Sequence, residues 1–216
     1  MERSGWARVG PMSGLLFAGV LVAVGVQAMG TDPGVRPGDP TAEIAEAMAG
    51  TFGSLSWPWL LALMVGIAAF VVFLADLQQR VRDAIPSARR WMSTVVLAGG
   101  LLIIVAILVQ VLLVAGLRTV ADRGVEDPAV AATLFVLTWE GMVTIIPGIA
   151  AMTSAAAVAS LRYRALPAWL GALAALAFVI GLTFYWVPVW LVWVAAVSLT
   201  LMLRREPVPT PERSAA

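Results

Sequence analysis

Apolar runs separated by short polar segments dominate this chain. A helix needs about 20 apolar residues to cross the roughly 30 Å hydrocarbon core of a bilayer. The runs of about this length or longer lie at residues 12–30, 58–76, 92–117, 128–161, 165–182 and 186–203. The pattern predicts an all-α membrane protein with six transmembrane helices, which form a single domain over residues 1–205.

The uncharged stretch 165–203 is the only run that has to be divided by a turn. It holds 39 residues. As one helix it would be about 58 Å long, nearly twice the thickness of the core. Gly181 and Pro188 favour a turn, and Tyr185 and Trp186 are typical of the membrane interface. We therefore predict two helices here.

The positions of the basic residues orient the predicted helices. All 14 basic residues are arginines, and the six-span arrangement places 11 of them on one side of the membrane. Only Arg36, Arg118 and Arg123 fall on the other side. Because loops rich in arginine stay in the cytoplasm, both termini are predicted to be cytoplasmic. This rule explains the four arginines of the 77–91 connection, for which binding of anionic lipid is the alternative explanation.

Three segments outside the helices carry separate predictions. The first outer loop, residues 31–57, should hold a short surface helix that has Asp39 as its N-cap and stops at Gly50. The proline-rich tail, residues 206–216, should be disordered in the cytoplasm because it has no apolar periodicity. Residues 1–28 are alternatively a cleaved signal peptide, and cleavage would leave the orientation of the other helices unchanged.

The run 128–161 is the longest and holds the unusual segment LTWEGMVTIIPG, residues 137–148. As a straight helix it would be about 51 Å long, so it must project from the bilayer, tilt or bend. Pro147, next to Gly148, predicts a kink near residues 143–147. Small residues recur at spacings of three and four, which favours close approach of another helix. These residues are Gly141, Thr144, Gly148, Ala151 and Ala155.

Glu140 is the only charged residue in this run. It follows Asp127 by 13 residues, about 20 Å along a helix, which places it in the outer half of the bilayer. A bare carboxylate there costs roughly 2.5–3.5 kcal/mol or more. Glu140 is therefore either a protonated group in a structural hydrogen bond between helices or a proton- or ligand-binding group facing water. The alternative is that it lies nearer the headgroups. Its candidate partners are Gln110, Thr144 and Tyr185, with Gln110 placed to form a direct hydrogen bond.

Composition excludes several classes of functional site. Hydrophobic residues make up 61% of the 216 residues, against about 45–50% in soluble domains. Cysteine, histidine and lysine are all missing from the sequence. This excludes disulfides, thiolate or imidazole metal ligands, cysteine nucleophiles, serine–histidine–aspartate triads and a lysine-bound retinal. The net charge of +1 gives no reason to expect nucleic acid as a partner. We expect no catalytic residue, metal or cofactor, and an enzyme would need carboxylate chemistry from Glu140 and a membrane-edge group such as Asp76.

Three local patterns carry a resemblance to a known group of proteins. They are DPTAEIAEAM in the first outer loop, FLADLQQRVRDA after the second run, and LRYRALPAWLGALAALAFV entering the fifth. In these patterns the chain resembles uncharacterised six-span integral membrane proteins of high-GC bacteria, a family of the domain-of-unknown-function type. The resemblance implies a six-helix membrane fold and no assigned activity, and it carries over no site residue. Together with the composition, it leads us to expect a multi-pass protein of the inner (plasma) membrane.

Two functions fit the sequence. The first is a non-enzymatic protein that lies in the lipid bilayer and binds or regulates a partner, either another membrane protein or a second copy of this chain. Its support is the small-residue pattern, the acidic outer loop and the lack of reactive side chains. The second is a small proton-linked transporter or sensor that uses Glu140 beside the proline kink.

Overall fold

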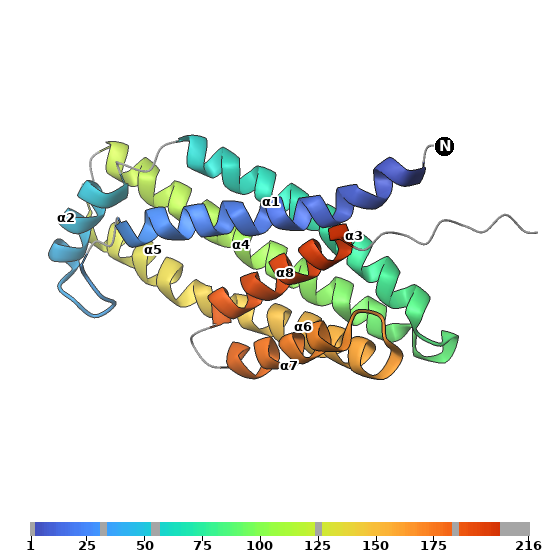
Figure 1. Ribbon diagram of the computed structural model, residues 1–216. Helices are drawn as coiled ribbons and strands as arrows, with labels where there is room; N and C mark the ends of the chain where they lie inside the picture. Colours follow the sequence, from blue (N-terminus) through green and yellow to red (C-terminus); the bar gives the residue numbers. More distant parts are fainter. Residues whose placement is uncertain (1–2, 31–33, 53–56, 124–126, 183–185, 204–216) are drawn as a thin grey trace, which may run out of the picture.

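The computed structural model describes residues 3–30, 34–52, 57–123, 127–182 and 186–203, which form helices joined by short connections (Figure 1). The described part contains no strand, so the predicted all-α class is confirmed. The predicted tail and Tyr185 lie outside the described residues. The helices are α1 (Arg3–Gly30), α2 (Thr41–Phe52), α3 (Trp57–Ala84), η1 (Ser87–Arg89), α4 (Trp91–Arg123), α5 (Pro128–Gly141), η2 (Met142–Ile145), α6 (Ile146–Tyr163), α7 (Ala168–Gly181) and α8 (Trp186–Leu203), where η marks a 3-10 helix.

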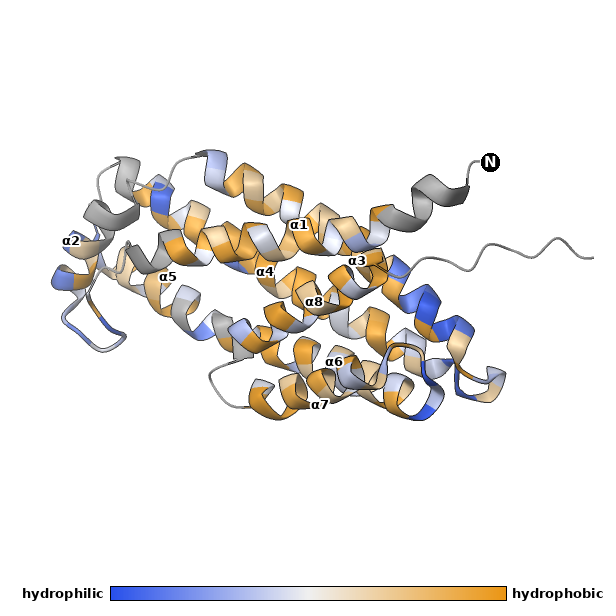
Figure 2. Ribbon diagram, in the orientation of Figure 1, coloured by the Kyte–Doolittle hydropathy of each residue, from blue (hydrophilic) through white to orange (hydrophobic). Residues whose placement is uncertain are grey.

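Four helical stretches are long and apolar enough to cross a membrane, which indicates a membrane protein. Figure 2 shows apolar residues along most of the length of these helices and hydrophilic residues gathered toward the two ends of the bundle. This separation matches a bilayer that covers the middle of the bundle. The four stretches are Val9–Val26, Pro58–Ala84, Ser87–Val120 and Pro128–Tyr163.

The apolar stretches of α7 and α8 are shorter than these four, and α7 ends at Gly181, where the sequence predicts a turn. α7 has 14 residues and is therefore about 21 Å long, less than the roughly 30 Å core. A Cβ at Gly181, its last residue, would lie 3.6 Å from Ile149. Gly148, next to Ile149, packs on Ile103 near the middle of α4. α7 thus ends beside the middle of the bundle, and complete crossing by α7 and α8 stays a prediction.

Close aromatic packing joins α1, α3 and α8. The rings of Phe17 and Phe70 stack with centroids 4.3 Å apart, and Trp190 meets both rings edge-on at 5.7 Å. Gly14 lets α1 approach this close, because a Cβ there would lie 2.5 Å from the ring of Phe73. Since lipid tails are as apolar as these side chains, van der Waals packing rather than exclusion of water holds the helices together.

α2 is the predicted surface helix, and it covers the ends of α4 and α5. Its Ile44 is 2% exposed and packs with Leu117, Ala132 and Phe135. The predicted cap is wrong in detail: Asp39 Oδ2 accepts a hydrogen bond from the backbone N–H of Arg36 (2.6 Å), which closes the turn before the helix. The helix also continues through the predicted stop to Phe52, because glycine weakens a helix without ending it.

Replacing Ile44 by alanine should release α2 from the bundle. Loss of a buried isoleucine side chain costs about 2–5 kcal/mol, which corresponds to about 30-fold or faster opening. We expect hydrogen exchange of the α2 amides to rise by that factor. The control Glu46→Gln alters an exposed side chain of the same helix and should leave exchange unchanged. Equal exchange in the two variants would show that Ile44 does not anchor α2.

Candidate functional site at the helix break

The long run 128–161 is broken where the sequence predicts a kink. α5 ends at Gly141, the 3-10 helix η2 follows, and α6 begins at Ile146 with Pro147 in its first turn. Pro147 has no N–H to donate to the carbonyl four residues before it, and its ring crowds that carbonyl, which favours a kink or break at this point. Thr144 Oγ1 donates a hydrogen bond to the Gly141 carbonyl (2.6 Å), which gives that carbonyl a partner at the break.

Gly141 faces α4 and packs directly on Gln110. A Cβ at Gly141 would overlap the amide nitrogen of Gln110. Both polar side-chain atoms of Gln110 are buried and have no hydrogen-bond partner within the described part of the chain. The predicted Gln110–Glu140 hydrogen bond is therefore not formed. The reason is helix geometry: successive residues are rotated by about 100°, so a backbone that turns Gly141 toward α4 turns Glu140 away from it.

Glu140 instead lies on the outward surface of the bundle. Exposed residues at spacings of three and four line this side of α5, η2 and α6, and Leu137 is 50% exposed. We call this surface the Glu140 face. The spacing is visible in the sequence, but only the structure shows that this side, and not the small-residue side, points outward. The Glu140 face consists of Thr133, Leu137, Glu140, Thr144 and Pro147.

The neighbours of Glu140 fix its level along the bundle. The adjacent Gly141 contacts Gln110. Gln110 precedes Arg118 by eight residues, about 12 Å along α4 toward the middle of the bundle. Phe135, five residues before Glu140, packs under α2 at the end of the bundle. Glu140 is thus more than one helical turn inside the end that α2 covers.

The predicted packing role of Gly148 has a clear counterpart in the structure. A Cβ on this residue would lie 2.8 Å from the carbonyl oxygen of Gly99 and 2.9 Å from the backbone nitrogen of Ile103. Ala155 is also buried, whereas Thr144 is exposed. The small residues at 141, 148 and 155 therefore mark the inward side of this helix, and Gly148 packs directly on the backbone of α4.

The two carboxylates that an enzyme would need are not brought together. Asp76 accepts a hydrogen bond from Arg80 Nε at 2.9 Å. Leu74, two residues before Asp76, packs on Gly100 of α4, whereas Gly141, next to Glu140, packs on Gln110 of α4. Gly100 and Gln110 lie about 15 Å apart along α4, so Asp76 and Glu140 lie at different depths in the bundle. Within the described ranges, no group of three or more acidic side chains could hold a metal ion.

No protein-family model, curated protein or solved structure matches this chain.

Proposed function

We propose that this chain is a non-enzymatic bacterial plasma-membrane protein that binds a membrane-spanning helix of another protein through the Glu140 face. The observation that carries the proposal is the exposure of Glu140 on the outside of an apolar bundle, more than one turn from its end. An ionisable group that faces lipid is costly, and such groups almost always face protein or water instead. A partner helix on this face would remove the carboxylate from lipid.

The chemistry of the Glu140 face favours a particular kind of partner. It carries one acid and no basic residue, and the hydroxyls of Thr133 and Thr144 already donate to the backbone carbonyls of Ala129 and Gly141. A twofold dimer would place the same patch on both sides of the interface and bring two Glu140 side chains together. The complementary partner is therefore a different protein whose helix presents arginine, lysine or another hydrogen-bond donor at this depth.

Purification in a mild detergent tests this function. The protomer has a mass of 22.8 kDa, and we expect a complex that contains one further, different polypeptide in fixed stoichiometry. That polypeptide should carry a donor side chain within its transmembrane helix. A particle with the mass of the monomer, or of an integral multiple of it, would contradict the proposal.

We further propose that both termini and the connection between α3 and α4 face the cytoplasm. The arginine positions support this orientation. Two arrangements of α7 and α8 give every arginine-rich segment the same side of the membrane. In the first, α7 and α8 each cross the bilayer, as six spans require. In the second, both enter the bilayer from the cytoplasmic side and return to it. The length of α7 and its end beside Ile149 favour the second arrangement.

Single-cysteine labelling checks this topology, because the chain has no cysteine of its own. We expect a membrane-impermeant maleimide to label Ser87→Cys only from the cytoplasmic side and Thr41→Cys only from the outer side. Leu182→Cys follows α7 directly: it reacts from outside if α7 crosses the bilayer and from neither side if α7 ends within it. Labelling of Ser87→Cys and Thr41→Cys from the same side would disprove the orientation.

A second candidate function is proton-linked transport or sensing. The observation in its favour is the broken helix beside the buried amide of Gln110, since interrupted helices often form binding sites in transporters. Proton flux into vesicles under a pH gradient should then fall in Glu140→Gln. Equal flux in this variant and the unmodified protein would exclude the transport function and leave partner binding.

A further inference from the structure

The turn between α6 and α7 holds a tyrosine with one arginine directly before it and one directly after it. α6 ends because Arg164 adopts the left-handed conformation, with φ of 59°. Its N–H donates to the Ser160 carbonyl, and the next N–H donates to the Ala159 carbonyl, which closes the end of the helix. The reversal leaves Arg162 and Arg164 exposed and Tyr163 partly buried between them.

A second connection brings another arginine to the same tyrosine. Arg89, in η1 between α3 and α4, donates a hydrogen bond from Nη1 to the Tyr163 hydroxyl (2.6 Å). Its Cζ lies 5.9 Å from the centre of the Tyr163 ring, and Cζ of Arg162 lies 6.0 Å from the same point. Contacts of this kind between guanidinium groups and an aromatic ring are attractive. Tyr163 therefore contacts both Arg89 and Arg162, although Arg89 is distant from the other two in the sequence.

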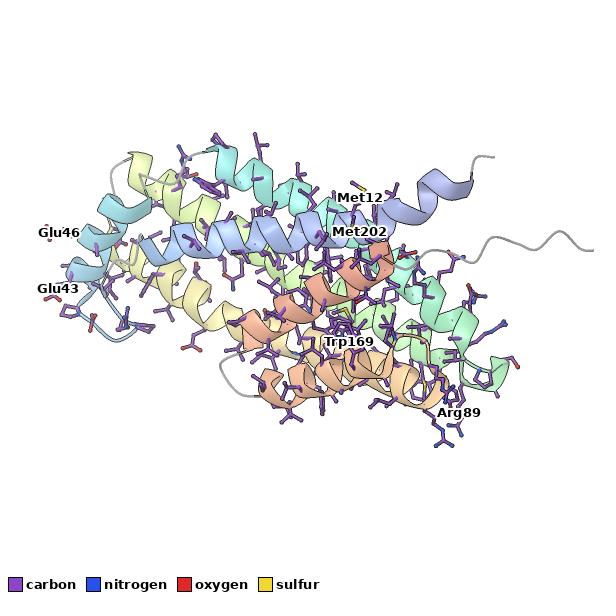
Figure 3. All side chains as sticks on the ribbon, viewed as in Figure 1. Met12, Glu43, Glu46, Arg89, Trp169 and Met202 are labelled. Carbon is purple, nitrogen blue, oxygen red and sulfur yellow. The ribbon has the colours of Figure 1, made fainter. Side chains whose placement is uncertain are left out.

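The positive charge of this cluster is not neutralised by neighbouring acids. Among the described residues, no carboxylate forms an ion pair with Arg89, Arg90, Arg162 or Arg164. Asp83, the acid closest in sequence to Arg89, is exposed and forms no ion pair with these arginines in the part of the chain that the structure describes. Figure 3 shows Arg89 extending from one end of the bundle, while the acidic residues Glu43 and Glu46 of α2 lie at the opposite end.

Two exposed tryptophans place the cluster at the level of lipid headgroups. Trp91 begins α4 directly after Arg90 and is 59% exposed, and Trp169 in the first turn of α7 is 54% exposed. Tryptophan is enriched where hydrocarbon meets headgroup, because its ring is apolar and its N–H is polar. A phosphate held by this cluster would thus have its glycerol and acyl chains directed along the bundle.

We propose that Arg89, Tyr163 and Arg162 form a binding site for the phosphate of an anionic phospholipid headgroup. Guanidinium groups offer paired donors that match phosphate oxygens. The tyrosine holds two of them in place before the lipid arrives, which lowers the entropy lost on binding. This site is independent of the Glu140 face and remains if the proposed partner does not exist.

Titration of the purified protein with phosphatidylglycerol in vesicles of phosphatidylcholine tests the site. A charged hydrogen bond from a guanidinium to a bound phosphate contributes enough to change affinity by about tenfold or more. Arg89→Gln and Arg162→Gln should each weaken binding by about that factor, and Tyr163→Phe should weaken it less while leaving the charge unchanged. Cardiolipin, which has two phosphates, should bind at least as tightly as phosphatidylglycerol.

Arg82→Gln is the matched control, because it removes one exposed arginine of α3 that does not contact Tyr163. Its affinity for phosphatidylglycerol should fall by no more than about fivefold, the contribution of any basic residue near an anionic surface. A loss equal to that of Arg89→Gln would mean diffuse attraction to charge and would overturn the proposal. So would equal binding to pure phosphatidylcholine vesicles, or displacement of the lipid by millimolar inorganic phosphate.

Discussion

Gly148→Val should separate α4 from α6 and destabilise the whole bundle. The added Cβ would meet the Gly99 carbonyl oxygen at 2.8 Å and the Ile103 nitrogen at 2.9 Å. Both are backbone atoms, so the contact can be relieved only if a helix moves. Overpacking of this kind costs about 1–3 kcal/mol or more, and α4 and α6 would lose the contact at Gly148 as well.

Thermal unfolding in detergent measures this effect. We expect the Tm of Gly148→Val to fall by about 2–12 °C, at about 2–4 °C per kcal/mol for a chain of this size. The Tm of Gly99→Val should fall by a similar amount, because a Cβ at this position would lie 2.6 Å from the Met152 nitrogen. The control is Gly19→Ala on α1, where an added Cβ meets nothing within 4 Å. An unchanged Tm in Gly148→Val would mean that α4 and α6 do not pack as described.

Glu140→Leu should abolish partner binding without harming the bundle. Glu140 is exposed on the outside of the bundle, so its replacement by leucine leaves no cavity in the core. Removing a carboxylate that faces lipid relieves a cost of roughly 2.5–3.5 kcal/mol, so Tm in lipid should stay equal or rise. Binding of the partner should fall at least about tenfold, because the partner's donor group would be buried without an acceptor.

Two variants separate this role from a general effect of charge. Glu140→Gln keeps a hydrogen-bond acceptor and should retain part of the binding. Glu46→Gln removes an exposed carboxylate of α2 and should bind the partner as the unmodified protein does. A large fall in Tm for Glu140→Leu would instead show that the carboxyl group holds the helices of this chain together.

The sequence predicts the helices and their interruption because backbone chemistry decides both. In lipid every N–H and C=O needs an internal partner, so long apolar runs become helices. Pro147 removes one such partner, and the break at η2 appears where this loss predicts it. The length of an apolar run did not fix the length of its helix: residues 165–182 predict a crossing helix, whereas α7 has 14 residues and ends at Gly181, close to Ile149. Complete crossing by α7 therefore stays a prediction.

The direction of Glu140 was harder to predict, because it depends on which side of the helix meets α4. The sequence contains two patterns with spacings of three and four, one of small residues and one that includes Glu140. Contact between Gly141 and Gln110, and between Gly148 and Gly99, decides that the two glycines face inward, whereas Thr144 of the same pattern is exposed. The same choice separates Gln110 from Glu140, although both lie at a similar depth.

The most direct test of the central claim is photo-crosslinking from the Glu140 face in intact membranes. A benzophenone amino acid at Leu137, one turn from Glu140, should join this chain to a single different polypeptide, and Glu140→Leu should abolish that product. The same group at Val105, on the exposed side of α4, should give no such product. Crosslinks from Leu137 to lipid alone, or equal products from both positions, would contradict the proposal that this face binds a partner helix.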